Sequence, residues 1–245
     1  MHEVVLKPTE IVRTAGLLCQ RIDERFPDSG LAKVARDLKG LAAQARAEAA
    51  AIRRPIYSLR LLVGLLVGVI FVLIAAAAVV AWQSFRGVDH LTPIDLLTAV
   101  EAGTNEIVLI GIAVLFLANL ERRIKRRRAL KALHQLRSMA HVIDMHQLSK
   151  DPGRYREYRV APTPSSPETV MTLAELARYL DYCSEMLSIT GKIAAIYIQH
   201  FDDDITMASA SEIEALVTGL ARKIWQKIMI ADSTQTALSE ASDSE

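Results

Sequence analysis

The sequence is poor in the residue types that build disulfide scaffolds, metal sites and β-sheets. It has two cysteines, Cys19 and Cys183, in no CxxC or other metal-spaced pair, so we expect two buried thiols in a reducing compartment. Aromatic residues make up only 5% of the chain while alanine and leucine abound, which favours helices over strands. The net charge of +1 provides no global positive field, so we expect no nucleic-acid partner.

The chain also lacks the short motifs that carry most enzyme chemistry. It has no P-loop, nucleophile elbow or dinucleotide fingerprint, since Gly191 and Gly219 stand singly in helical patterns. The acidic run 202–204 lacks the alternating ligands and closing glutamate of an EF-hand, so we expect a solvated turn there. The first ten residues contain no apolar signal-peptide core, so the first membrane segment would itself direct insertion. We therefore expect neither enzymatic activity nor a cofactor.

What the sequence does contain is a long stretch without charge. Residues 61–82 read LLVGLLVGVIFVLIAAAAVVAW. An α-helix of this length measures about 33 Å, enough to cross a hydrocarbon core of roughly 30 Å. A soluble helix this long would need a polar face, and this one has none. The stretch therefore predicts a membrane span.

A second apolar run, residues 107–118, is short for a bilayer. We expect a crossing at about 104–121, preceded by an external loop with an interfacial helix over 93–103; the alternative is one continuous helix. Glu101 and Glu106 are candidate ion-facing residues, because acidic side chains at membrane depth are costly and usually functional. If the crossing begins at residue 104, both lie near the external interface and cost little.

Positive charge follows the second span. Residues 121–128 read ERRIKRRR, and Arg53, Arg54 and Arg60 precede the first span, so the positive-inside rule places both termini in the cytoplasm. The same cations are candidates for contact with anionic lipid headgroups, although orienting the protein would by itself explain them. These candidates are Arg122, Arg123, Lys125, Arg126, Arg127 and Arg128.

The segments outside the hairpin show helical spacing of apolar residues. The predicted helices cover residues 8–26, 31–53, 129–148 and 172–200, with a last helix capped by Ser209 or Ser211. Each helix has one apolar face, so packing the N-terminal and C-terminal helices together buries both sets.

The sequence thus predicts an all-α membrane protein, a two-helix transmembrane hairpin carrying a cytoplasmic helical bundle. Its parts are N-terminal helices (1–56), the hairpin (57–121) and a C-terminal helical region (122–231). Four prolines within 152–168 predict a linker, and the polar residues 232–245 predict a disordered acidic tail.

One predicted helix carries a candidate metal site. His134, His141 and Asp144 fall on one face of the 129–148 helix. Zinc needs three or four converging ligands, which His200 or the run 202–204 would have to complete. The alternative, which we favour, is a polar face hydrogen-bonded to solvent or to another helix.

Three segments of the chain are similar to a known group of sequences. LCQRIDERFPDSGLA, LRSMAHVIDMHQLSKDP and EIEALVTGLARKIWQKIMI resemble a family of uncharacterised bacterial two-span membrane proteins. The resemblance implies a bacterial source and the inner membrane, and it carries no activity.

Three function classes follow from these observations. The first is a non-enzymatic membrane scaffold that binds another protein. The second is a homo-oligomeric ion channel with Glu101 or Glu106 at its mouth; the arrangement is loosely similar to the mitochondrial calcium uniporter, whose acidic filter signature is missing here. The third is a metal-dependent cytoplasmic enzyme that uses the histidine-bearing helix.

Overall fold

The computed structural model describes residues 5–86, 93–155, 163–165, 171–199 and 201–243. Over these ranges the chain is helical, with no β-strand, which confirms the all-α class. The chain forms two compact units, each described below by itself. Residues 1–53 and 128–245 form the unit that we call the bundle, and residues 54–127 form the unit that we call the apolar unit.

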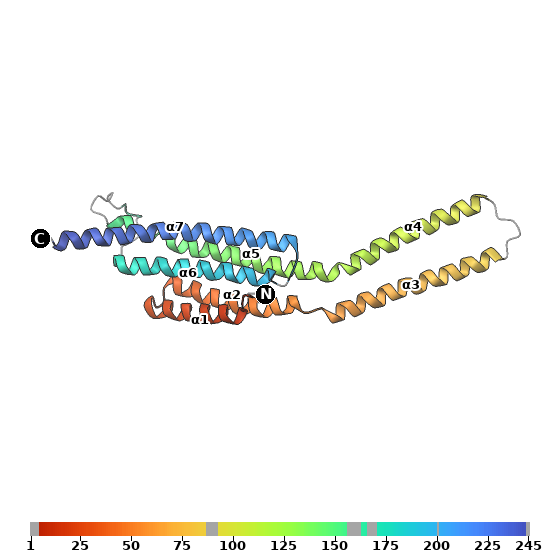
Figure 1. The fold of residues 1–245 in the computed structure, drawn as a ribbon, viewed down its shortest axis with the longest axis horizontal. Coiled ribbons are helices and arrows are strands. Elements are labelled where there is room, and N and C mark those ends of the chain that lie inside the picture. The colour runs from red at the N-terminus through yellow and green to blue at the C-terminus, as the bar shows by residue number, and fades with distance from the viewer. Residues whose placement is uncertain (1–4, 87–92, 156–162, 166–170, 200, 244–245) are drawn as a thin grey trace. The chain divides into compact units, whose positions relative to one another are not determined.

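The first two helices of the bundle are a pair joined by a tight turn (Figure 1). α1 (Pro8–Arg25) begins with a proline, whose fixed φ suits the first helical turn. In the turn Asp28 has φ 56°, a left-handed conformation that aspartate tolerates better than most residues. The Ser29 hydroxyl then accepts a hydrogen bond from the Ala32 N–H (3.1 Å) and caps α2 (Gly30–Arg53). Both predicted N-terminal helices are confirmed.

The central helix of the bundle is α6 (Leu173–Ile198), which packs against α1 and α2 and also against α7 (Asp204–Asp243) (Figure 1). Its predicted start at residue 172 is confirmed, and a capping box forms there. The Thr172 hydroxyl accepts from the Glu175 N–H (3.2 Å), while the Glu175 carboxylate accepts from the Thr172 N–H (2.8 Å). α5 (Leu120–Leu148) joins the bundle from residue 128 onward.

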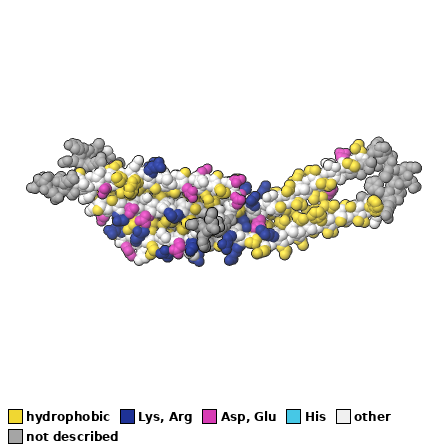
Figure 2. All heavy atoms as spheres, in the orientation of Figure 1, with side chains coloured by type: hydrophobic (Ala, Val, Ile, Leu, Met, Phe, Trp, Pro, Cys, Tyr) yellow, Lys and Arg dark blue, Asp and Glu magenta, His cyan; other side chains and the backbone are white. Residues whose placement is uncertain are grey.

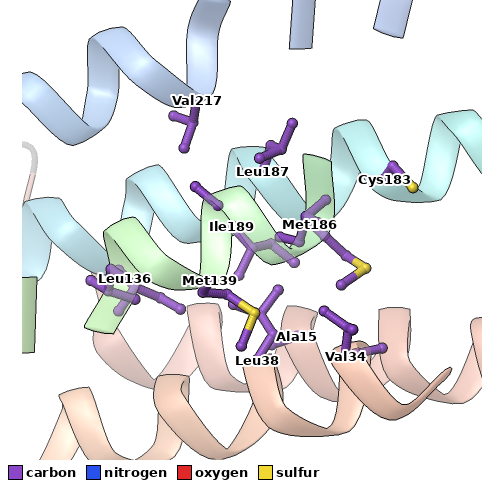
Figure 3. Packing of buried hydrophobic residues seen from close by; sticks show 14 of the residues in the cluster. Ala15, Val34, Leu38, Leu136, Met139, Cys183, Met186, Leu187, Ile189 and Val217 are labelled. Carbon is purple, nitrogen blue, oxygen red and sulfur yellow. The ribbon is translucent and has the colours of Figure 1, made fainter. Parts of the chain in front are cut away.

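One hydrophobic core unites helices from both ends of the chain (Figure 3). Side chains from α1, α2, α5, α6 and α7 point toward one another in it. They include Ala15, Val34, Leu38, Leu136, Met139, Met186, Leu187, Ile189 and Val217. The apolar positions predicted from helical spacing in α1, α2, α5 and α6 are buried there, so the periodicity correctly identified the inward faces.

The predicted start of the last helix is wrong. α7 begins at Asp204, five residues before the earlier of the two predicted caps, Ser209. Asp203 caps it instead: its Oδ2 accepts from the Thr206 N–H (3.1 Å) and from the Thr206 hydroxyl (2.8 Å). Asp203 is only 4% exposed, whereas Asp202 and Asp204 are exposed, so the solvation predicted for the acidic run 202–204 holds for those two residues and is wrong for Asp203.

The tail that the sequence predicted to be disordered, residues 232–245, is helical over most of its length. α7 continues through it to Asp243. Ala231 belongs to the hydrophobic core and Thr234 is buried, with its hydroxyl donating to the Ile230 carbonyl (2.7 Å). Burial of the helix on one side, which a composition argument does not capture, extends the helical region beyond residue 231.

The apolar unit contains α3 (Tyr57–Arg86), α4 (Pro93–Ala118) and the first turns of α5. None of its described side chains is buried; Leu61 and Ile107, for example, are 75% and 73% exposed. Figure 2 shows hydrophobic side chains over α3 and α4, whereas charged side chains of both signs are interspersed on the visible face of the bundle. The described chain contains one helical stretch long and apolar enough to cross a membrane, within Gly30–Val80, and Gly103–Ala118 is a shorter apolar helix.

α4 is one continuous helix from Pro93. The separate interfacial helix expected over 93–103 is therefore not observed, and the alternative of one continuous helix is correct. It ends at Ala118, three residues before the expected end of the second crossing. There the Asn119 side-chain amide donates to the Leu115 carbonyl (2.8 Å), competing with the helical hydrogen bonds.

The proline-rich linker begins as a short 3-10 helix, η1 (Pro152–Tyr155), whose Tyr155 hydroxyl donates to the Met171 carbonyl. The linker residues 156–162 and 166–168 lie outside the described residues. Residues 87–92 of the predicted external loop and the candidate metal ligand His200 also lie outside them.

Candidate functional site

The best-defined polar site of the apolar unit is centred on Glu121, three residues beyond the apolar segment that ends at Ala118. Its Oε2 accepts from Arg60 Nε (2.7 Å), and its Oε1 accepts from Lys125 Nζ (2.8 Å) and the Ile56 N–H (3.3 Å). Lys125 is one helical turn further along α5, whereas Ile56 immediately precedes α3 and Arg60 lies in its first turn. One carboxylate therefore ties the beginning of α3 to the beginning of α5.

Hydrogen bonds from Arg60 and Lys125 stabilise the charged form of Glu121 and lower its pKa from 4.5 to about 2. The carboxylate is 15% exposed and stays ionised near neutral pH. A carboxylate with so low a pKa is far from the near-neutral pKa that suits a general acid or base. The site is consequently suited to holding the start of α3 against the start of α5.

The predicted headgroup-binding cations on α5 are not equivalent. Lys125 is 13% exposed and is paired with Glu121. The Arg123 guanidinium stacks on the Phe116 ring, 4.9 Å from its centroid. Arg127 and Arg128 are exposed, as are Arg122 and Arg123, while Arg126 is half-buried. The cations most accessible to an anion are therefore a subset of the predicted six.

The structure does not bring Glu101 and Glu106 together on one face. Both lie on α4 and both are exposed. Five residues on an α-helix correspond to a rotation of about 140°, so the two carboxylates leave the helix in different directions. Asn105, four residues after Glu101 and therefore on the same side of α4, is exposed as well.

The histidine-bearing face of α5 is also spread out. His134 and His141 are exposed, and the half-buried Asp144 accepts a hydrogen bond from Gln147 Nε2 (2.6 Å). A Cβ on Gly30 would lie 2.5 Å from Cε1 of His146, so the His146 ring packs on the start of α2. Among the residues that the structure describes, no group of three or more His, Cys, Asp or Glu side chains is placed to hold a metal ion.

A second polar cluster, which sequence reasoning missed, caps the end of α5. Lys227 Nζ of α7 donates to the carbonyls of Gln147 (2.8 Å) and Lys150 (3.1 Å). Burial lowers the pKa of Lys227, and the charges of Asp151 and Asp144 act in the opposite direction. The Gln147 side chain is buried, and its Oε1 has no partner in the described part of the chain. No sequence signal indicates this cluster, since Lys227 is remote in sequence from its two acceptors.

Both cysteines are free and buried. Burial raises the pKa of the Cys183 thiol to about 12, and burial together with Asp23 raises that of Cys19. Thiols with a raised pKa are poor nucleophiles near neutral pH, which agrees with the interpretation of both as small hydrophobic side chains.

The Glu121 site itself was missed, although the sequence contained one indication of it. A glutamate four residues before a lysine is a favourable helical pair. The contribution of Arg60 and Ile56 is not visible in the sequence, because it depends on how α3 meets α5 within the apolar unit.

Comparison of the chain with family models, with curated proteins and with solved structures found no match.

Proposed function

We propose that the chain is an integral protein of a bacterial inner membrane that anchors a helical interaction scaffold without enzymatic activity. α3 and α4 form its two-span hairpin, and both termini lie in the cytoplasm. Its partners are the bilayer with its anionic headgroups, a protein that binds the bundle, and further copies of the same chain.

The contrast between the two units carries this proposal. The bundle buries its apolar side chains in one core, as soluble helical domains do. The apolar unit buries none of its described side chains, and Leu65, Phe71 and Leu109 are each at least 60% exposed. An apolar surface of this extent is unfavourable in water and favourable in lipid, and helices are one of the two structures that satisfy their backbone there.

The distribution of charge supports the proposed orientation. Arginines and lysines flank both apolar helices on the bundle side of the sequence, and the residues between those helices carry few. Arg127 and Arg128, which are exposed, would each contribute about 1 kcal/mol near an anionic surface.

The bundle offers a surface suited to a partner protein. Trp225 and Met229 of α7 are 60% and 52% exposed and line an open groove with Leu173, Ala177 and Ile228. Exposed tryptophan and methionine beside such a groove are typical of residues that dominate binding energy in protein interfaces.

The ion-channel and metal-enzyme alternatives remain predictions. Glu101 and Glu106 diverge around α4, and His134, His141 and Asp144 are not gathered into a metal-binding group in the described part of the chain. No particular contact or distance favours either alternative over the scaffold.

The proposed topology is tested with reporter fusions in a bacterial host. Alkaline phosphatase fused after residue 88 is expected to be active, because the reporter works only outside the cytoplasm. The same enzyme fused after residue 150 or residue 245 is expected to be inactive, and green fluorescent protein at those positions to be bright. Active phosphatase at residue 245 would contradict the proposed orientation, and release of the chain by alkaline carbonate would contradict membrane insertion.

The scaffold role is tested by photocrosslinking at Trp225. A benzoylphenylalanine at position 225 is expected to capture one discrete protein, and the same probe at Arg222, an exposed position on α7, serves as the matched control. Identical products at both positions would contradict a specific role for the groove.

A further inference from the structure

We propose that the bundle contains a phosphate-binding pocket between α2 and α5, formed by Arg128, Lys131 and Gln135 with Gln44. The pocket lies wholly within the bundle, so this inference does not depend on the proposed membrane topology. Its ligand is a phosphate ester or diester, carried by a lipid headgroup or by a free small molecule.

Two rows of side chains line the pocket. On α5, Arg128, Lys131 and Gln135 are spaced by three and four residues and therefore share one face of the helix. On α2, Gln44 and Glu48 follow the same spacing. Buried side chains of Ile52 and Ala132 also line the pocket and supply its apolar part, and its volume of about 300 Å³ is that of a small ligand site.

The two cations in the pocket form no ion pair within the part of the chain that the structure describes. Neither Arg128, Lys131 nor Gln135 takes part in an ion pair or hydrogen bond within the described residues. This distinguishes them from Lys125, which is paired with Glu121. Cations held along one side of a pocket without an ion-pair partner favour an anion that reaches both at once.

The one carboxylate in the pocket is occupied by other groups. Glu48 Oε1 accepts from Gln44 Nε2 (2.8 Å), and its Oε2 accepts from the hydroxyl of Tyr197 (2.9 Å). Tyr197 is buried on α6, so this contact keeps the carboxylate on the α2 side of the pocket. With Arg128 and Lys131 positive and Glu48 negative, the pocket has a net charge of +1.

A phosphate group matches this arrangement better than a carboxylate does. The guanidinium of Arg128 presents a planar set of donors, the ammonium of Lys131 adds a mobile charge, and the Gln135 amide adds a neutral donor. A tetrahedral phosphate has oxygens enough to accept from all three side chains, whereas a carboxylate has two.

The experiment uses the full chain in a non-ionic detergent at low ionic strength, titrated in a calorimeter with two probes. The first is inorganic phosphate, and the second is dihexanoylphosphatidylglycerol, a short-chain lipid with a phosphodiester headgroup. R128Q/K131Q is expected to lower the affinity at least about tenfold. Each of the two substitutions removes a charge-assisted hydrogen bond to the phosphate, and the loss of both accounts for a change of this size in the dissociation constant. R222Q/K223Q removes two exposed charges from α7 and is expected to leave binding unchanged.

Two further variants test whether charge in the pocket determines the affinity for phosphate. E48Q keeps an acceptor for the Tyr197 hydroxyl but removes the negative charge, so it is expected to tighten binding several-fold, whereas E214Q on the exposed side of α7 is not. R128K/K131R keeps both charges and is expected to retain most of the affinity, and circular dichroism verifies that each variant is folded.

The two probes distinguish the sources of the phosphate. Binding of both supports a pocket open to free phosphate esters, and binding of the lipid alone supports a headgroup site. The proposal is overturned if neither probe binds, or if R128Q/K131Q and R222Q/K223Q lose affinity equally. The reporter fusions described above are insensitive to these variants, so failure here and failure of the membrane proposal are separate results.

Discussion

The replacement of Glu121 by glutamine is predicted to loosen the start of α3. The carboxylate accepts hydrogen bonds from Arg60, Lys125 and the Ile56 N–H, and glutamine keeps one acceptor oxygen but loses the charge. The decrease in the pKa of Glu121 from 4.5 to about 2 corresponds to roughly 3 kcal/mol at 1.36 kcal/mol per pH unit. Because Arg60 is 62% exposed, solvent screening reduces this, and we expect a loss of about 1–2 kcal/mol.

Amide hydrogen exchange measures this loss where it occurs. The Ile56 N–H is bonded to Glu121, and the Arg60 N–H is bonded to the Ile56 carbonyl (3.0 Å). A local loss of about 1–2 kcal/mol speeds exchange of these amides roughly 5- to 30-fold in E121Q when exchange follows the opening equilibrium. E185Q, which removes the Arg21 ion pair within the bundle, is the control and is expected to leave both amides unchanged.

The same reasoning fixes the pH dependence of that contact. The pKa of Glu121 is lower in the folded chain, so its contribution is complete above the unfolded value of 4.5 and is lost as the pH falls toward 2. After correction for intrinsic rates, the two amides should lose protection across this range in the natural protein and stay nearly constant in E121Q. Exchange in E121Q within twofold of the natural protein near neutral pH would refute the role given to Glu121.

Three other changes test the bundle. Leu187→Ala removes a fully buried side chain from α6 and should cost about 2–5 kcal/mol, seen as a lower Tm by circular dichroism; an unchanged Tm would contradict the core assignment. Thr172→Ala removes the cap of α6 and should cost about 1 kcal/mol in urea unfolding, with Thr172→Ser as the conservative control. Cys183 should react with a thiol reagent at pH 8 only on unfolding, because burial raises its pKa to about 12; rapid reaction in the folded protein would show that the site is open.

Local sequence signals predicted the helices well wherever capping and periodicity agree. Pro8 and the capping box at Thr172 and Glu175 mark helix starts that the structure confirms. The same logic misplaced the start of α7, because Ser209 is an equally good cap by composition and only the burial of Asp203 selects the earlier position. Local preference identifies the candidates for a cap, and packing chooses among them.

The candidate sites were harder to predict for the same reason. His134, His141 and Asp144 look like ligands on a helical wheel, but whether side chains converge depends on what other helices bring to them. Conversely, Arg128 and Lys131 looked like two more charges on a basic helix. The pocket that they line exists only because α2, far away in sequence, packs beside α5.

The sequence by itself therefore determined the helical class, the inward faces of the helices and the apolar stretch that begins at residue 61, since these depend on composition and on the 3.6-residue period. The tertiary structure alone decided which side chains from the two ends of the chain meet in their common core, that Glu121 joins α3 to α5, and that Lys227 caps α5. Each of these contacts joins residues that are distant along the chain, and local propensity contains no information about which distant residues will meet.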